Sequence, residues 1–145
     1  MATISKQEQF YVWEGKTIKG FLHELSDFVE ETGIAMGLDE RARCDIELAV
    51  GEAAANSWEH SYGGKQGRLR LEMEKDQEAV EIRLTDWGKP YTLENAPEPE
   101  VGSDLDKTNL NGLGLMIMRK AMDKVETSSV PKVGNSIIMR KRLAR

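Results

Sequence analysis

Two runs of alternating apolar and polar residues in the middle of the chain constrain its fold more than any other feature. Residues 68–74 read RLRLEME and residues 79–85 read AVEIRLT, with the polar stretch KDQE between them. Alternation with a period of two is typical of a strand that has one face on a core and the other face in water. The two runs therefore predict a β-hairpin with one wet face.

The segments around this hairpin predict three helices and three more strands. Between residues 16 and 35, apolar side chains recur every three or four positions, as they do on one face of a helix. Asp39 is a good N-cap for a second helix, which is rich in small residues. Helices are predicted over about 16–35, 39–61 and 113–124, and strands over about 4–13, 125–130 and 135–142.

A long segment separates the hairpin from the third helix. Residues 89–111 hold three of the four prolines, several acidic residues and little periodicity. A loop of this length inside a compact domain is usually functional or mobile. We find no internal repeat and no second domain, so residues 1–145 are expected to form a single domain.

Composition and charge exclude several classes of protein. The chain is 39% hydrophobic and 31% charged, which excludes a disordered or low-complexity chain. Its net charge of −5 disfavours nucleic acid and anionic membranes as direct partners. A single cysteine forms no internal disulfide. With no apolar signal at the N-terminus and no stretch of about 20 apolar residues, a cytoplasmic location is the simplest expectation.

Three polar residues break the alanine-rich pattern of the second predicted helix. Glu52, Asn56 and His60 recur at every fourth position, so they lie on one narrow stripe of a helix. An asparagine oxygen suits a hard cation such as Mg²⁺, and a glutamate can accept a proton. The alternative is that this stripe faces water, and the spacing alone does not separate the two.

Two further short motifs stand where an element ends or begins. Asp86-Trp87-Gly88 closes the second strand of the hairpin, where an acid can accept a hydrogen bond from an amine and a glycine permits close approach of a flat ligand. Asn111-Gly112-Leu113-Gly114-Leu115 leads into a predicted helix, whose N-terminal amides favour an anion such as phosphate. Taken singly, an ordinary turn and a helix-entry loop are the commoner explanations.

The order of the three motifs is more specific than any one of them. Glu-x-x-x-Asn on a helix, a hairpin ending in Asp-x-Gly, a long loop and Gly-x-Gly opening a helix resembles the Bergerat ATP-binding fold of DNA gyrase, histidine kinases and their relatives. Within that superfamily, the chain is most similar to the anti-sigma factor serine kinases, over about residues 14–143. The resemblance implies an α+β fold: a two-layer sandwich of a mixed, mostly antiparallel sheet with helices on one face.

The resemblance also implies roles for the helix stripe. Glu52 matches the general base that takes a proton from a serine hydroxyl of a protein substrate. Asn56 matches the Mg²⁺ ligand that ties the metal to the phosphates of ATP. His60 is expected to line the rim of the nucleotide site.

The other two motifs match the rest of a nucleotide site. Asp86 matches the acid that binds the adenine amino group, and Gly88 matches the glycine that leaves room for the ring. Gly112 and Gly114 match the glycines whose amides hold phosphates, and Leu113 and Leu115 lie in the same nucleotide-binding segment. Either Asn135 or Ser136 falls where relatives often place a threonine that helps to bind adenine. Residues 89–111 become the ATP lid.

One departure from the family pattern concerns the lid. Some relatives carry an arginine two residues before Gly-x-Gly, where it meets the γ-phosphate, but this chain has Leu110 there. No arginine occurs between residues 84 and 111, and Lys89 and Lys107 are the cations of that segment. A cation at a transferring phosphoryl group contributes strongly to the rate.

The sequence therefore supports one main functional hypothesis and two alternatives. The resemblance implies an anti-sigma factor that binds an RNA polymerase sigma factor and phosphorylates a serine of an anti-anti-sigma protein with a STAS domain, using ATP and Mg²⁺. The first alternative is a non-catalytic module gated by ATP or ADP. The second is a switch kinase that acts on another regulatory complex. Family members commonly dimerise, and the strand predicted over 4–13 offers an unpaired edge for a homodimer.

Overall fold

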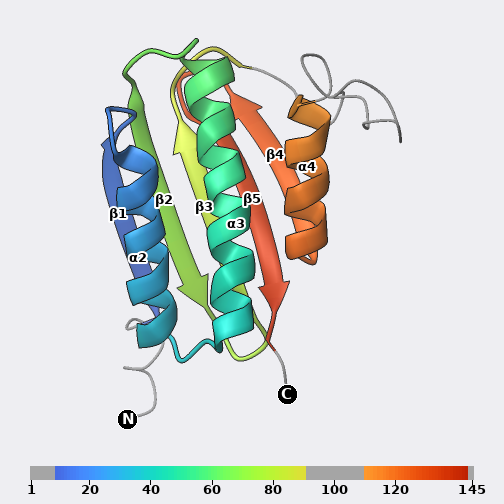
Figure 1. The fold of residues 1–145 in the computed structure, drawn as a ribbon. Helices are drawn as coiled ribbons and strands as arrows, with labels where there is room; N and C mark the ends of the chain where they lie inside the picture. The colour runs from blue at the N-terminus through green and yellow to red at the C-terminus, as the bar shows by residue number, and fades with distance from the viewer. Residues whose placement is uncertain (1–8, 91–109, 144–145) are drawn as a thin grey trace.

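The structure, a computed structural model, describes residues 9–90 and 110–143. They form one sheet with the strand order β1-β2-β3-β5-β4, and all four strand pairs are antiparallel. The helices lie on one face of this sheet (Figure 1). The elements are β1 (Phe10–Lys16), α2 (Phe21–Ala35), α3 (Glu40–Asn56), the π-helical turn η1 (Ser57–Ser61), β2 (Arg68–Lys75), β3 (Ala79–Asp86), α4 (Leu110–Ala121), β4 (Lys124–Val130) and β5 (Gly134–Arg142).

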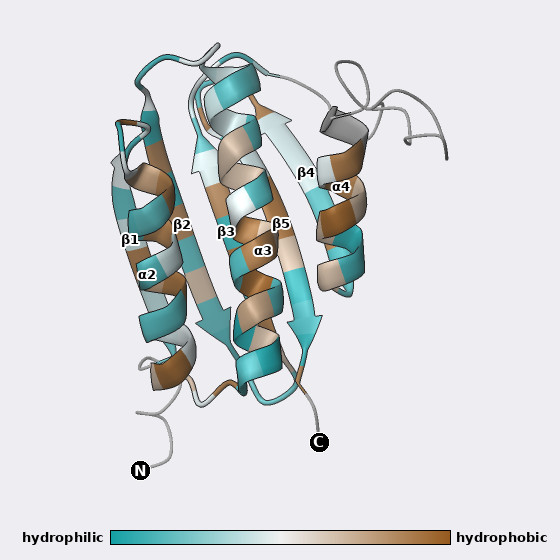
Figure 2. Cartoon of the chain, viewed as in Figure 1, coloured by the Kyte–Doolittle hydropathy of each residue, from teal (hydrophilic) through white to brown (hydrophobic). Residues whose placement is uncertain are grey.

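The expected α+β fold with helices on one face is confirmed. The hairpin predicted from alternation is β2 and β3, and its register pairs Leu71 with Leu84 and Met73 with Ile82. These four side chains are at most 1% exposed and form the centre of the core. Figure 2 shows the apolar and polar residues that alternate along the central strands. No pair in the described sheet is parallel, so the expected mixed character of the sheet is absent from this part of the chain.

Small side chains bring α3 close to the middle of the sheet. Ala49, Ala53 and Ala54 are completely buried, and the larger Ile46 and Val50 beside them are at most 1% exposed. Burial of apolar surface of this kind contributes about 25 cal/mol per Å² to folding. Because α3 lies at the centre of the helical layer, the polar residues on its C-terminal half are held rigidly with respect to the strands.

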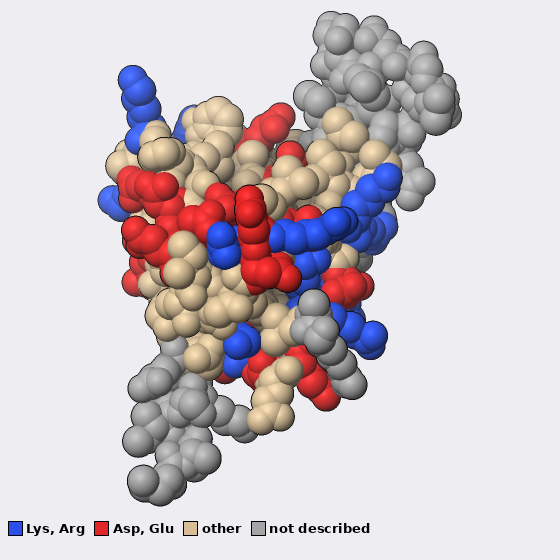
Figure 3. All heavy atoms as spheres, turned by 60° about the horizontal axis from the view of Figure 1, so that its bottom comes forward, with Lys and Arg blue, Asp and Glu red and all other residues tan. Residues whose placement is uncertain are grey.

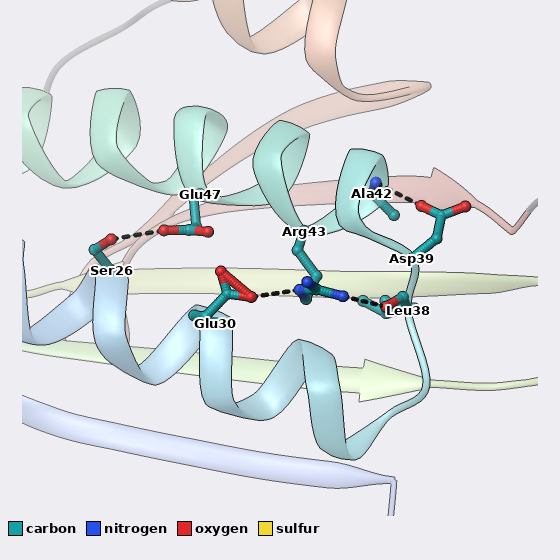
Figure 4. A network of polar contacts seen from close by, with 7 residues as sticks. All are labelled: Ser26, Glu30, Leu38, Asp39, Ala42, Arg43 and Glu47. Carbon is teal, nitrogen blue, oxygen red and sulfur yellow. Dashed lines mark hydrogen bonds and ion pairs between the residues drawn. The ribbon is translucent and has the colours of Figure 1, made fainter.

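The junction between α2 and α3 is fixed by polar contacts (Figure 4). Arg43 forms an ion pair with Glu30, and the Ser26 hydroxyl donates a hydrogen bond of 2.7 Å to Glu47. A Cβ atom on Gly33 would lie 2.8 Å from Cγ of Arg43, so the glycine lets the arginine side chain cross α2. These contacts set the angle at which α2 flanks α3.

Charges are distributed unevenly at this end of the molecule. Figure 3 shows acidic residues gathered on the side of α2 and basic residues on the side of α4 and β5. Helix α2 itself carries the acidic residues Asp27, Glu30 and Glu31. A helix of the length of α3 spans about 25 Å, whereas the Debye length at physiological salt is about 8 Å. Salt therefore screens the charges of the acidic side, and they contribute little to the electrostatic potential at the opposite end of α3.

Several element boundaries differ from the sequence prediction. Helix α2 begins at Phe21 and not near residue 16, because Gly20 has a φ of 88° in the left-handed region and precedes the first turn. The first strand was expected over 4–13, but it extends to Lys16; residues 1–8 lie outside the described range. The last turn of the long predicted helix is π-helical. Helix α4 begins at Leu110, three residues before the predicted start.

None of the helices in the described part of the chain is both long enough and apolar enough to cross a bilayer.

Candidate functional site

Four elements that carry the predicted site residues end or begin at the same end of the molecule. These are the C-terminal end of α3 with η1, the end of β3, the start of α4 and the start of β5 (Figure 1). The arrangement follows from the topology, because β3 and β5 are antiparallel neighbours and pair Asp86 with Asn135. Residues distant in the sequence are thus placed around the C-terminal end of the central helix.

Helix α4 brings Gly114 against the polar stripe of α3. A Cβ atom on Gly114 would lie 3.1 Å from Oε2 of Glu52 and 3.5 Å from Nδ2 of Asn56. Contacts of 3.1 Å to a Cβ atom are tighter than most that folded proteins contain. The glycine therefore permits the close approach of α4, and three of the predicted site residues lie in one place.

Asn56 is buried in this place with an unpaired donor. Its side chain is 6% exposed, and its Nδ2 atom has no hydrogen-bond partner among the described residues. A buried polar group without a partner costs about 1–3 kcal/mol, and such groups in native structures usually indicate a missing ligand or strain. Asn56 is thus a candidate for contact with a bound group.

Asp86 at the end of β3 is held by three donors. The Ser61 hydroxyl donates to Oδ2 at 2.8 Å, the Gly88 amide donates to Oδ1 at 3.1 Å, and Asn135 Nδ2 donates to Oδ1 at 2.8 Å. The residue is 2% exposed. A carboxylate offers about four acceptor positions, so one position is left for a donor on a ligand.

Gly88, two residues after Asp86, has a packing role of its own. A Cβ atom on Gly88 would overlap the carbonyl group of Ser61 and lie 2.9 Å from the Ser61 Cβ atom. The Lys89 amide donates to the same carbonyl oxygen at 2.8 Å. The glycine therefore makes room for η1. That it also leaves room for the adenine ring stays a prediction.

The structure separates the two candidates on β5. Asn135 donates to both Oδ1 of Asp86 and the carbonyl oxygen of Gly88, the latter at 3.0 Å, and its own Oδ1 accepts from the Ser129 hydroxyl at 2.6 Å. Ser136 instead contacts the Thr85 hydroxyl at 3.0 Å. Asn135 is thus the one that reaches the Asp86 carboxylate.

The remaining predicted site residues lie nearby with different environments. His60 is half-buried in η1, next to Ser61. Leu113 is half-buried, and Leu115 is part of the hydrophobic core. Gly112 lies in the first turn of α4, where backbone amides lack intrahelical acceptors, whereas Gly114 lies further into the helix. The predicted ATP lid falls almost wholly on residues 91–109, outside the described residues.

Sequence reasoning missed two residues at the end of η1: Ser61, its last residue, and Tyr62, which follows it. Ser61 holds Asp86, and the Tyr62 hydroxyl accepts a hydrogen bond of 2.8 Å from the Trp87 amide. Burial raises the pKa of Tyr62, the Trp87 amide lowers it, and the Asp86 carboxylate raises it further. The π-helical turn that aims these side chains at the end of β3 has no sequence pattern of its own, although π-turns often occur at functional sites.

Comparisons with known proteins agree with this geometry. The solved structure of the catalytic domain of the histidine kinase ThkA superposes with a TM-score of 0.53 over 92% of this chain and 96% of that domain, at 19% identity, which shows a shared fold. Residues 20–141 match the family model of the histidine kinase-like ATPase domain.

Curated relatives narrow the family further. The serine-protein kinase RsbW of Listeria innocua is 32% identical over 102 residues, which is 66% of this chain and 65% of RsbW, slightly less than two thirds of that relative's length. The anti-sigma F factor of Clostridium beijerinckii is 32% identical over 68% of this chain and 69% of its own. That of Halalkalibacterium halodurans is 25% identical over 99% of this chain and 91% of its own. The chain belongs to the histidine kinase-like ATPase family and, within it, to the anti-sigma factor serine kinases.

Proposed function

We propose that this protein is an ATP-dependent protein serine kinase that also acts as an anti-sigma factor. The main support for the proposal is that Glu52 lies beside Asn56 and Gly114. The turn that follows this helix also holds Asp86, through a hydrogen bond from the Ser61 hydroxyl. A protein that only held a nucleotide would have no special need of a carboxylate at this position. The names of the relatives, serine-protein kinase and anti-sigma F factor, support the same proposal.

The residues present fit ATP and Mg²⁺. The unpaired Nδ2 atom of buried Asn56 is a donor, which suits a phosphate oxygen of ATP. The side-chain oxygen of the same residue is the atom that would bind magnesium, which typically takes only one or two protein oxygens together with phosphates. Asp86 retains an acceptor position for the adenine amino group. The first turn of α4 is where backbone amides lack intrahelical acceptors, and such amides suit phosphate oxygens. Magnesium, when bound, neutralises charge on the phosphates.

Glu52 acts as the general base in this proposal. Its carboxylate accepts the proton of the serine hydroxyl of the protein substrate, which makes the serine oxygen a better nucleophile. The side chain is half-buried, and its Oε2 atom faces Gly114, so its position is fixed by the contact between α3 and α4. Positioning of this kind is a large part of catalysis of phosphoryl transfer.

The proposed protein substrate is an anti-anti-sigma protein with a STAS domain, and the proposed second partner is an RNA polymerase sigma factor. A phosphoserine adds about −1.5 to −2 charges at neutral pH. This chain carries a net charge of −5, so phosphorylation weakens the complex with the antagonist through repulsion. The sigma factor then stays bound. A cytoplasmic location and a role in stress response follow from such partners.

The test is transfer of phosphate from radiolabelled Mg-ATP to a purified anti-anti-sigma protein. We expect a phosphoserine product, and Glu52→Gln should lower the rate by roughly 10²–10⁴-fold, as loss of a general base does, while ATP still binds. Glu24→Gln is the matched control, because Glu24 is exposed on α2. Unchanged transfer in Glu52→Gln would refute the role of Glu52.

One observation favours a second function, a non-catalytic module gated by ATP or ADP. No arginine lies between residues 84 and 111 to meet a γ-phosphate. In this case the wild-type protein binds ATP and captures its partner in a nucleotide-dependent way, but no phosphoserine forms. A switch kinase, by contrast, forms phosphoserine on a different regulatory protein, and a sigma factor does not co-purify with it.

We also propose a homodimer through β1. This strand forms an edge of the sheet, and Phe10 and Val12 on it are 43% and 38% exposed. An exposed apolar edge strand is a template for pairing with another chain. A monomeric mass at micromolar concentration in light scattering would contradict the dimer.

A further inference from the structure

The ladder between β2 and β3 changes at the end that borders the candidate site. Its last backbone pair joins Leu69 to Asp86, and the register places Arg68 opposite Trp87 as the next pair. The Trp87 amide does not bond to the Arg68 carbonyl oxygen directly. It donates to the Tyr62 hydroxyl at 2.8 Å, and that hydroxyl donates to the Arg68 carbonyl oxygen at 2.5 Å.

The tyrosine oxygen therefore stands between the two strands where a backbone hydrogen bond is expected. The side chains of the pair still meet, since the Arg68 guanidinium lies 4.2 Å from the centre of the Trp87 ring. A backbone N–H and a carbonyl group that face each other in an antiparallel pair normally bond to each other. The hydroxyl thus acts as a spacer that holds the end of β3 away from β2.

The loop after η1 is shaped to admit the tyrosine ring. Gly63 and Gly64 have φ values of 60° and 79°, in the left-handed region. A Cβ atom on Gly67 would overlap the Tyr62 ring. The ring consequently fills a space that only a glycine at position 67 leaves open.

The spacer lies directly beside the turn that contains Asp86. Within residues 87–89, each backbone amide already has a protein acceptor: Trp87 donates to Tyr62, Gly88 to Asp86 and Lys89 to Ser61. The turn is thus held at two points, by Ser61 at the end of η1 and by Tyr62 directly after it. Removal of the Tyr62 hydroxyl takes away the protein acceptor of the Trp87 amide, which then turns to water or to the Arg68 carbonyl oxygen. Either change loosens the turn that carries the Asp86 carboxylate.

We propose that Tyr62 is a positioning residue of the nucleotide site, whose hydroxyl spaces β2 from β3 and thereby sets where Asp86 meets the adenine base. This inference rests on the proposed function, because it assigns the base to Asp86. Tyr62 acts through the backbone of the turn and needs no contact with the nucleotide. Tyr62 therefore affects the affinity for the nucleotide rather than proton transfer by Glu52.

The test compares Tyr62→Phe with wild type in two measurements. The first, without nucleotide, is amide hydrogen exchange of Trp87, with Leu84 in the middle of β3 as an internal reference. We expect Trp87 protection to change at least about 10-fold in the variant while Leu84 is unchanged, because only the end of the ladder loses its acceptor. The second is Mg-ATP affinity by calorimetry at low temperature, where we expect a loss of about 10-fold, typical of one lost hydrogen bond.

Two control variants separate positioning from mere stability. Tyr11→Phe removes the same atom from β1, two strands away from β3. Val29→Ala empties a fully packed position on α2, where the wild-type side chain is 1% exposed, and lowers the melting temperature without touching the turn. Both controls should bind ATP as wild type does.

The outcomes are distinguishable. If Tyr62→Phe binds ATP as tightly as wild type, or if Val29→Ala weakens binding as much, the positioning role is refuted while the proposed function stands. An unchanged Trp87 amide also refutes it. If the wild-type protein itself fails to bind Mg-ATP, the proposed function falls, and the positioning role falls with it.

Discussion

The two ends of the candidate site differ in how completely the protein itself satisfies their polar groups. At the end of β3, the Asp86 carboxylate accepts three hydrogen bonds, and the backbone amides of residues 87–89 all have acceptors. At the contact between α3 and α4, the buried amide of Asn56 has a donor with no partner in the described part of the chain. We refer to these as the Asp86 end and the Asn56 end.

The two ends therefore contribute to folding in different ways. The Asp86 end joins β3, β5 and η1 through its own hydrogen bonds, so it is part of the fold before any ligand binds. The Asn56 end retains an unsatisfied group, which a bound ligand would pair. Buried polar groups that are unpaired cost stability, whereas fully paired networks rigidify a protein.

The largest expected effect is that of Asp86→Asn. The amide replaces an acceptor oxygen by a donor that faces Gly88 and Asn135 or Ser61, so both folding and nucleotide binding suffer. We expect a loss of about 2 kcal/mol in the free energy of unfolding and of at least about 100-fold in ATP affinity. Urea unfolding and calorimetry measure the two quantities. Asp27→Asn is the matched control, since that side chain is 64% exposed. If Asp86→Asn unfolds with the same free energy as wild type, the distinction between the two ends is contradicted.

Asn56→Ala should have the opposite balance. Because its Nδ2 atom is unpaired, truncation removes a group that destabilises the fold, and the free energy of unfolding should be unchanged or rise by up to about 1 kcal/mol. Affinity for Mg-ATP should fall about 10–50-fold through the lost metal contact. The gap between wild type and variant should close when EDTA removes the magnesium. A clear loss of stability would mean that the Asn56 end, too, is part of the fold.

Gly114→Ala should have a smaller effect confined to the Asn56 end. The new methyl group would lie 3.1 Å from Oε2 of Glu52, so the carboxylate must move by a few tenths of an ångström. We expect phosphoryl transfer to slow about 3–10-fold, while alanine stabilises the helix by up to about 1 kcal/mol. Gly51→Ala is the matched control, because a Cβ atom on that helical glycine meets no other atom within 4 Å. Equal rates in the two variants would contradict this account.

Most of the fold could be predicted from the sequence because the patterns that specify it are local. Alternation located β2 and β3 almost to the residue, and the alanine-rich stretch of α3 packs against the sheet as expected. The motif order also brought Glu52, Asn56 and Gly114 to one place, since each motif stands at an element end that the topology gathers. Glu52, Asn56 and Asp86 were thus predicted from motifs, and their assigned roles stay predictions.

What the sequence did not reveal depends on geometry between elements. The choice of Asn135 over Ser136 follows from the pairing of β3 with β5, because adjacent residues on a strand face opposite sides of the sheet. Ser61 and Tyr62 reach β3 because the last turn of the helix is π-helical, which shifts the direction of every later side chain. Neither a strand register nor a π-turn can be predicted from residue types alone.

The smallest expected effect is a pH dependence that isolates Tyr62 at the Asp86 end. Burial, the largest influence, raises the pKa of this phenol above its ordinary value of about 10. The folded protein therefore holds the Tyr62 proton more tightly than the unfolded chain does, and stability falls as the pH rises above about 10. Tyr62→Phe should lose less stability than wild type as the pH rises from about 10 to about 11.5 in urea unfolding. The difference should be small, because Tyr62 is only half-buried and solvent screens its charge. An identical decline in wild type and Tyr62→Phe would show that the phenol at the Asp86 end is not coupled to folding.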